Sequence, residues 1–350
     1  MLTFMGFHLP LDGYGYGTIQ IAKELQRNDR RVRVLDMRAN DGFGTAGDRE
    51  WHVPGTVVAL CTPDWLPYIH GDELISYTMF EASGLPKGWA DLINANADRV
   101  MVPCEWCRQV FVDNGVRKPI DVVKWGVAPE DYWPLQRSTP LHDLPASWLS
   151  DGERPYRFLW SGTPDLRKGW DVAYRAFMAA FGKRTDVELV LHFRGDLPGR
   201  VKFSDKNVRT VVGLFDRPLL RMMLQEVDCF VFPSRGEGWG SPPREAAATG
   251  LPVIATNYGG LAEEIDQWAM PLRVSGFSAA EYGWWDAGTI GQWPEPDTNH
   301  LVELMRYCVE HRAEMARFGL KAAEWLRCEG TWARTARDLL KSVEQREVMA

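Results

Sequence analysis

The sequence has no run of about 20 apolar residues, so it contains no stretch suited to cross a bilayer as a helix. Its first residues have neither a basic start nor a long apolar segment, unlike a secretory signal peptide. It also lacks an excess of positive charge. The formal net charge is −7 at pH 7, which disfavours a general nucleic-acid-binding protein. We therefore expect a cytoplasmic protein without stable membrane insertion.

Cysteine is also scarce, with six residues in 350. Cys104 and Cys107 have the CxxC spacing found in zinc and redox sites. A zinc site needs a further pair of ligands at suitable spacing, and the sequence shows none. A redox motif belongs in a thioredoxin-like context, which is missing too. We therefore predict free thiols at the start of a helix.

Length and hydrophobicity indicate two domains with sizeable cores. The chain has 350 residues, of which 45% are hydrophobic. Short apolar runs alternate with amphipathic stretches in both halves, a pattern typical of parallel sheets with right-handed crossovers. We predict an α/β protein with two doubly wound, Rossmann-like domains that face each other across a cleft. Among its helices, one is expected at 18–26 and another at 300–326.

A polar, proline-bearing segment interrupts the alternation and divides the chain. We predict a first domain at 1–134, a linker at 135–155, a second domain at 156–330 and a final helix at 331–350. Ligands of such sheets bind at the carboxyl ends of the strands. Both glycine-rich segments of the chain are expected at such ends.

The most informative segment is PSRGEGWGSPPREAAATGLPVIAT, residues 233–256, which follows an apolar strand. It places Glu237 and Glu245 eight positions apart, across a glycine-rich turn and the start of a helix. Ser241 is suited to cap this helix and Gly250 to end it. The glycines let the backbone approach a ligand and leave N–H groups free for oxygen atoms. Such a loop fits a phosphorylated, polyhydroxylated ligand.

This segment resembles the signature of family 4 glycosyltransferases, which have the GT-B fold and use nucleotide-activated sugars. Their pattern is Glu, seven residues, Glu, a small-residue helix and a Gly-x-Pro-Val-Ile strand. Glu237, Glu245 and residues 250–254 match it. The resemblance implies that Glu245 accepts hydrogen bonds from the ribose, that the loop before it holds the transferred sugar and that Glu237 lies near the reacting carbon. The donor-binding residues of that loop are then Glu237, Gly238, Trp239, Gly240 and Ser241.

A second match is SGTPDLRKG, residues 161–169. Lys168 corresponds to the lysine that contacts the donor diphosphate in the family. The arginine expected after Gly162 is Thr163 here, and this departure leaves one positive charge unassigned. Arg167 is a candidate to supply it. We assign Thr163, Arg167 and Lys168 to donor binding, and Lys168 also to catalysis together with Glu237.

Two N-terminal features complete the candidate site. Three alternating glycines follow the first strand, where the family has a loop that closes over the donor phosphates. Gly15 and Gly17 are the candidates there, and a tight turn is the alternative. Glu81 stands where related enzymes often carry a histidine that faces the acceptor. It is a candidate catalytic group on that side, and a structural glutamate is the alternative.

The resemblance implies a retaining hexosyl- or pentosyltransferase that moves a sugar from a nucleotide diphosphate sugar to an acceptor hydroxyl. It implies no metal or other cofactor, and the sequence lacks the Asp-x-Asp triplet that binds metal in the other main glycosyltransferase fold. A UDP-sugar is the expected donor and a GDP-sugar the alternative. The acceptor stays open: a glycan, a lipid-linked glycan or another hydroxylated molecule, a modified DNA base included. An epimerase of the same fold and a non-catalytic nucleotide-sugar-binding subunit are the alternative functions.

Overall fold

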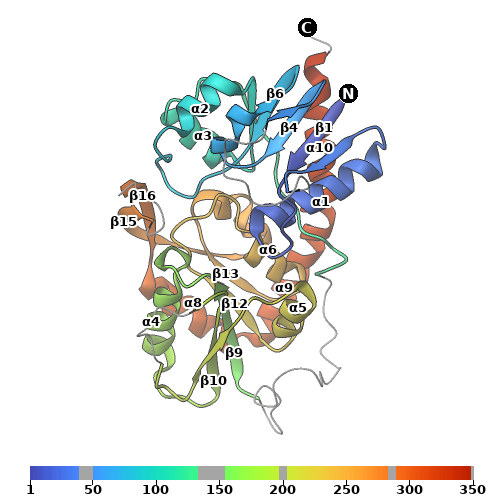
Figure 1. The fold of residues 1–350 in the computed structure, drawn as a ribbon. Coiled ribbons are helices and arrows are strands. Elements are labelled where there is room, and N and C mark those ends of the chain that lie inside the picture. Colours follow the sequence, from blue (N-terminus) through green and yellow to red (C-terminus); the bar gives the residue numbers. More distant parts are fainter. Residues whose placement is uncertain (39–49, 133–153, 197–202, 283–288, 348–350) are drawn as a thin grey trace.

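The computed structural model describes residues 1–38, 50–132, 154–196, 203–282 and 289–347. Figure 1 shows two stacked lobes, with both chain ends at the upper lobe. The predicted linker at 135–155 lies almost entirely outside the described residues.

The upper lobe is the N-terminal domain. Its elements are β1 (Leu2–Gly6), α1 (Gly13–Asn28), β2 (Arg33–Asp36), β3 (Trp51–His52), β4 (Thr56–Leu60), the 3-10 helix η1 (Pro63–Tyr68), β5 (Ile69–His70), β6 (Glu73–Tyr77), α2 (Trp89–Asn96), β7 (Arg99–Val102), α3 (Glu105–Asp113) and β8 (Ile120–Val122). Six of the strands form one parallel sheet in the order β2-β1-β4-β6-β7-β8, and β3 pairs separately with β5.

The lower lobe is the C-terminal domain. Its elements are β9 (Tyr156–Gly162), η3 (Leu166–Lys168), α4 (Trp170–Phe181), β10 (Val187–Phe193), β11 (Val208–Val212), α5 (Arg217–Gln225), β12 (Cys229–Phe232), α6 (Ser241–Ala248), β13 (Val253–Thr256), η4 (Gly259–Ala262), α7 (Ile265–Trp268), β14 (Met270–Leu272), β15 (Val274–Glu281), β16 (Thr289–Pro296), α8 (Thr298–Glu310) and α9 (Arg312–Glu329). A second parallel sheet has the order β11-β10-β9-β12-β13-β14.

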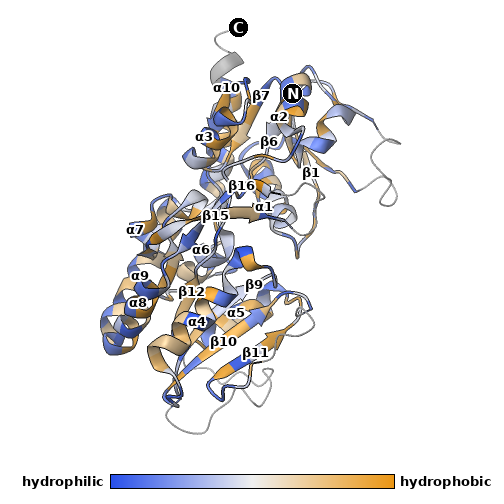
Figure 2. Ribbon diagram, turned by 90° about the vertical axis from the view of Figure 1, so that its left-hand side faces the viewer, coloured by the Kyte–Doolittle hydropathy of each residue, from blue (hydrophilic) through white to orange (hydrophobic). Residues whose placement is uncertain are grey.

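This strand order is that of dinucleotide-binding Rossmann sheets, and the order reverses between β9 and β12. Strands β9, β10, β12 and β13 are buried along their whole length. Figure 2 shows hydrophobic residues along β10, with hydrophilic ones on the outer helices α8 and α9. Continuous apolar runs of this kind are what a parallel sheet needs, because helices cover both of its faces.

The two sheets confirm the predicted fold class, an α/β protein with two Rossmann-like domains. A last helix, α10 (Trp332–Glu347), returns to the N-terminal domain and packs on α1 (Figure 1). The Thr335 hydroxyl donates to the Lys124 carbonyl at 2.8 Å, and the Ser342 hydroxyl donates to the Asp121 carboxylate at 2.8 Å. These bonds fix the end of the chain beside the strand that ends the first sheet.

Three elements differ from the sequence-based expectation. The helix expected at 18–26 begins at Gly13, because Asp12 caps it by accepting from the Gly15 N–H at 2.9 Å. The helix expected at 300–326 is two helices, α8 and α9, separated at His311, whose backbone leaves the helical region (φ −116°, ψ 40°). The antiparallel hairpin of β15 and β16 was not expected.

That hairpin extends from the C-terminal domain to the N-terminal domain. Ser83 and Gln292 are joined by two hydrogen bonds, of 3.2 and 2.8 Å. Tyr282 and Trp293 lie in the same hydrophobic cluster as Phe80 of the N-terminal domain. Among the described residues, no helix combines the length and the hydrophobicity needed to span a membrane.

Candidate active site

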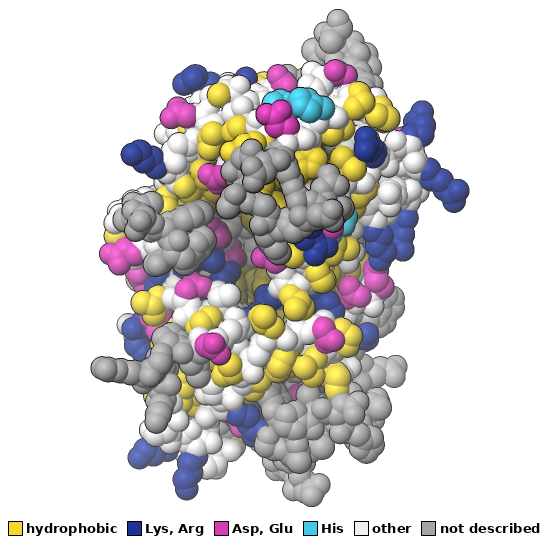
Figure 3. Space-filling model, in the orientation of Figure 1, with side chains coloured by type: hydrophobic (Ala, Val, Ile, Leu, Met, Phe, Trp, Pro, Cys, Tyr) yellow, Lys and Arg dark blue, Asp and Glu magenta, His cyan; other side chains and the backbone are white. Residues whose placement is uncertain are grey.

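A cavity of about 320 Å³ lies between the domains, beside the point where the second sheet reverses its order. The loops after β9 and β12 line it from the C-terminal domain. Asp12, Tyr14, Met79 and Glu81 line it from the N-terminal domain. Figure 3 shows basic side chains across the middle of the molecule, where the lobes meet. Strand ends at such a reversal are where doubly wound sheets bind ligands.

Glu237 is the most enclosed carboxylate of this cavity, with a side chain only 8% exposed. Its Oε1 atom accepts a hydrogen bond from Lys168 Nζ at 2.6 Å and another from the Ser234 hydroxyl at 2.9 Å. Arg167 Nη1 lies 3.6 Å from the same oxygen. The structure therefore brings together Glu237 and Lys168, which are 69 positions apart in the sequence.

Arg244 fixes the loop that carries Glu237. Its guanidinium lies between the rings of Trp239 and Trp268, 3.9 and 4.4 Å from their centroids. It donates to the carbonyls of Trp239 and of Gly260, the latter at 2.8 Å. Burial lowers the Arg244 pKa to about 9, so the side chain keeps its charge at pH 7. The loop backbone is thus held by a buried cation.

The loop leaves three backbone donors unused. In the part of the chain that the structure describes, the N–H groups of Gly238, Trp239 and Gly240 have no hydrogen-bond acceptor, and all three residues line the cavity. Gly240 has φ +85°, a conformation that favours glycine. Ser241 also lines the cavity, but it is the first residue of α6, and Gly240 rather than Ser241 occupies the N-cap position. Free N–H groups before a helix provide a site for anionic oxygen atoms.

Arg167 lines the cavity but faces carboxylates. Its Nη1 donates to the Gly236 carbonyl at 2.8 Å and lies 3.5 Å from Glu81. Burial lowers the pKa of Arg167, but the nearby Glu81 and Glu237 carboxylates outweigh burial and raise it. Arg167 thus has carboxylates close by, as Lys168 has Glu237, and the assignment of Arg167 to donor binding stays a prediction. Thr163 itself lines the cavity and donates from its hydroxyl to Asp165.

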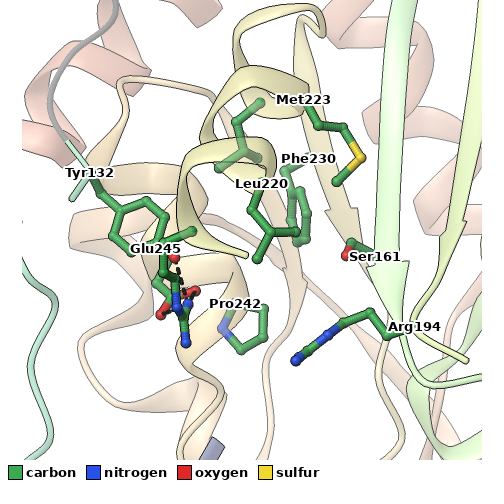
Figure 4. A pocket seen from close by; sticks show the side chains of 10 residues that line it. Tyr132, Ser161, Arg194, Leu220, Met223, Phe230, Pro242 and Glu245 are labelled. Carbon is green, nitrogen blue, oxygen red and sulfur yellow. Dashed lines mark hydrogen bonds and ion pairs between the residues drawn. The ribbon is translucent and has the colours of Figure 1, made fainter. Parts of the chain in front are cut away.

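Glu245 lies in a smaller adjoining cavity of about 40 Å³. Its two carboxylate oxygens accept from Arg217 Nη1 at 2.8 and 2.9 Å. Figure 4 shows Glu245 beside Tyr132, with Arg194 approaching Pro242 from the opposite wall. Arg217 and Arg194 carry no motif around them, and the sequence analysis missed both.

Gly15 and Gly17, the candidate donor-binding glycines of the N-terminal domain, do not line either cavity. Both lie inside α1. A β-carbon on Gly15 would come within 2.5 Å of the Leu9 backbone, and one on Gly17 within 2.8 Å of the Trp125 ring. Their small size therefore serves close packing of the helix start.

The CxxC pair forms free thiols at a helix start, as predicted. Cys104 caps α3, and its thiol donates to the Gly238 carbonyl at 3.2 Å. The Cys107 thiol donates to the same carbonyl at 3.3 Å.

Among the described residues, one group has the spacing of metal ligands: Glu50, His52 and His70 lie together at the surface and do not line the cavity.

The fold and this site define a two-domain protein of the GT-B type. Residues 155–280 match the family described as Glycosyl transferases group 1. Two solved structures share the fold along nearly the whole chain. Sucrose-phosphate synthase from Thermosynechococcus elongatus has a TM-score of 0.67 at 14% identity and covers 100% of this chain and 99% of its own. Anabaena HepE in complex with UDP-glucose has a TM-score of 0.64 at 12% identity, with coverages of 99% and 100%.

Curated relatives are similar over part of their length. A D-inositol 3-phosphate glycosyltransferase of Arthrobacter sp. (strain FB24) is 30% identical over 136 residues, 36% of this chain and 32% of that protein. A GDP-mannose-dependent alpha-mannosyltransferase of Mycolicibacterium smegmatis is 28% identical over 210 residues, 59% and 52%. The chain thus spans about a third to a half of the length of these relatives. The family match and the relatives support a group 1 glycosyltransferase, and the finer assignment to family 4 stays a prediction.

Proposed function

We propose that this protein is a retaining glycosyltransferase that moves a sugar from a nucleoside diphosphate sugar to an acceptor hydroxyl without a metal ion. The observation that carries the proposal is the Lys168–Glu237 pair, which lies in the interdomain cavity beside the free N–H groups of the 238–240 loop. The group 1 match covers these residues. HepE was solved with UDP-glucose, and the Mycolicibacterium relative is named for GDP-mannose, which supports a nucleotide sugar as donor.

In the proposed complex, Glu245 accepts hydrogen bonds from the ribose hydroxyls. Arg217 now donates to both Glu245 oxygens, so ribose binding requires a shared or rearranged contact there. The diphosphate lies along the loop N–H groups and Lys168, and the sugar lies next to Glu237. A UDP-sugar is the first candidate and a GDP-sugar the second.

The transfer breaks the bond between the anomeric carbon and the diphosphate oxygen. Negative charge grows on the leaving diphosphate, where Lys168 and the loop N–H groups are positioned to stabilise it. The acceptor oxygen attacks the same face of the sugar, and its proton passes to the leaving phosphate oxygen. No strong protein base is needed for this step. Glu81, 25% exposed on the N-terminal wall, is proposed to orient the acceptor hydroxyl.

The donor site is tested by thermal unfolding with UDP, GDP, ADP and their sugars. A ligand at 100 times its Kd adds about 2.7 kcal/mol of stability. We expect one nucleotide to stabilise the protein and Glu245→Ala to abolish that shift. Glu324→Ala, at an exposed position of α9, is the matched control and should keep the shift. No shift with any nucleotide would reject the donor site.

The reaction is tested by analysing products with and without candidate acceptors. Lys168→Ala removes a charge-assisted hydrogen bond of about 1.5–3 kcal/mol, so transfer or slow donor hydrolysis should fall about ten- to a hundredfold. NMR of the product shows directly whether the anomeric configuration of the donor sugar is retained or inverted. Activity in EDTA tests metal independence. Epimerised sugar formed without acceptor would favour the epimerase alternative. Nucleotide binding without any turnover would favour the non-catalytic subunit.

A further inference from the structure

We propose that Arg194 is the second cation that binds the donor diphosphate, in place of the arginine that the chain lacks at position 163. The inference rests on the proposed function and adds a residue to its site. Arg194 directly follows β10, which pairs with β9 in the second sheet. It is therefore at the carboxyl end of β10, whose neighbour β9 borders the point where the strand order reverses.

Arg194 belongs to the wall shared by the two cavities. Ser161, Arg194 and Pro242 line both the small cavity that holds Glu245 and the larger one that holds Lys168 and Glu237. A diphosphate covalently joins the nucleoside to the sugar. A donor with its ribose at the first cavity and its sugar at the second must pass this shared wall. Arg194 is the charged residue of the three, and Figure 4 shows its side chain extending toward Pro242.

The charge balance of the cleft singles out the same residue. Lys168 and Arg167 both lie within 4.0 Å of Glu237, and Arg217 pairs with Glu245. Among the described residues, Arg194 has no carboxylate oxygen within 4.0 Å. The cavity wall therefore holds a guanidinium whose charge no described neighbour balances. A bound anion would balance that charge.

The hydrogen bonds of Arg194 are also incomplete. Its Nη2 donates to the carbonyl of Leu11, in the N-terminal domain, at 2.6 Å. Its Nε is buried and has no acceptor. A buried donor without an acceptor is unfavourable, and a guanidinium presents its N–H groups in a planar fork that matches phosphate oxygens. A diphosphate oxygen at this wall offers the guanidinium an acceptor and balances its charge.

A purely structural role for Arg194 would explain fewer of these observations. In that role Arg194 only bridges the domains through its bond to Leu11, which uses one of the five N–H groups of a guanidinium. Loss of such a bridge would weaken every ligand of the cleft alike. Loss of a phosphate contact weakens only ligands that carry the diphosphate, and this difference separates the two roles.

The test is calorimetric titration of the whole chain with UDP and GDP, and with uridine and guanosine as ligands without phosphate. The variants are Arg194→Ala, Arg194→Lys and the control Arg184→Ala, which removes an exposed arginine of the same domain that pairs with Asp186. For the nucleotide that binds wild type, we expect Arg194→Ala to raise Kd about ten- to a hundredfold. Its nucleoside should change less than about twofold, and Arg194→Lys should recover part of the loss.

The outcomes separate the inference from the function on which it rests. If wild type binds the diphosphate and Arg194→Ala binds it equally well, or loses nucleoside and nucleotide in equal proportion, Arg194 does not hold the diphosphate and the proposed function is unaffected. If wild type binds neither UDP nor GDP, the proposed UDP-sugar and GDP-sugar donors are excluded, and this inference fails with them. A selective loss for the diphosphate, absent in Arg184→Ala, supports it.

Discussion

Replacing Arg244 with methionine removes the cation that holds the 237–240 loop while keeping a long apolar side chain in its place. Arg244 donates to the carbonyls of Trp239, Gly240, Gly260 and Glu263, and its guanidinium is stacked between two tryptophan rings. The variant leaves these buried carbonyls without their donor. It also removes the two ring contacts, each worth about 0.5–2 kcal/mol.

Opposing contributions to the free energy of unfolding determine how far Arg244→Met destabilises the protein. Charge-assisted hydrogen bonds contribute about 1.5–3 kcal/mol each, whereas removing a buried charge recovers several kcal/mol of desolvation. Breaking one side of a buried charged network typically costs about 3–5 kcal/mol net. At about 1.4 °C per kcal/mol for a single cooperative unit of this length, we expect Tm to fall by about 4–7 °C.

The assay is thermal unfolding of wild type, Arg244→Met and the control Arg306→Met. Arg306 also donates to two backbone carbonyls, of Ala179 and Ala180, but at the surface, so its loss should change Tm little. The donor Kd of Arg244→Met, measured well below its Tm, should also rise because the loop N–H groups lose their fixed positions. A Tm within 2 °C of wild type would refute the idea that Arg244 fixes the loop.

Two further predictions concern pH and close packing. Burial lowers the His192 pKa from 6.5 to about 4, while its ring accepts from Ser161 at 2.8 Å and donates to the Gly213 carbonyl at 3.0 Å. The unfolded chain therefore binds more protons between pH 6.5 and 4, and stability falls as pH falls through that window, by about 2 kcal/mol from pH 7 to 5. Denaturant unfolding of His192→Gln should lack this part of the pH dependence, and an unchanged dependence would exclude His192 as its source. Gly126→Ala places a methyl group 2.2 Å from the backbone that precedes α10, so it should destabilise the protein by about 1–3 kcal/mol, whereas Gly276→Ala, with open space around it, should not. Equal stability of the two variants would contradict the packing argument.

The second sheet was predictable because its strands are apolar runs with polar or glycine-rich ends. Residues 156–162, 187–193 and 229–232 are such runs in the sequence, and they form strands β9, β10 and β12. Helix ends were harder to predict, because they depend on single caps. Asp12 captures the Gly15 N–H and converts an expected glycine loop into the first turn of α1.

Residues of the candidate site could be named from the sequence where a local motif carries them and not elsewhere. Lys168, Glu237 and Glu245 each lie in a short pattern with recognisable spacing. Arg194 and Arg217 do not, and their roles depend on which distant residues the fold places beside them. Arg217 meets Glu245 across 28 positions, and Arg194 meets Leu11 across 183. The surroundings of Arg167 also depend on information absent from the sequence, since Glu81 and Glu237 approach it only in the folded chain.

The hairpin of β15 and β16 changes how the two halves are expected to melt. It continues the C-terminal chain, yet it buries Tyr282, Ile290 and Trp293 in the hydrophobic cluster of the N-terminal domain. An N-terminal half produced without it would expose the surface that these side chains cover, including that of Phe80. Although each half has its own sheet, the N-terminal half does not complete its hydrophobic core alone, so the two halves are expected to unfold as one cooperative unit.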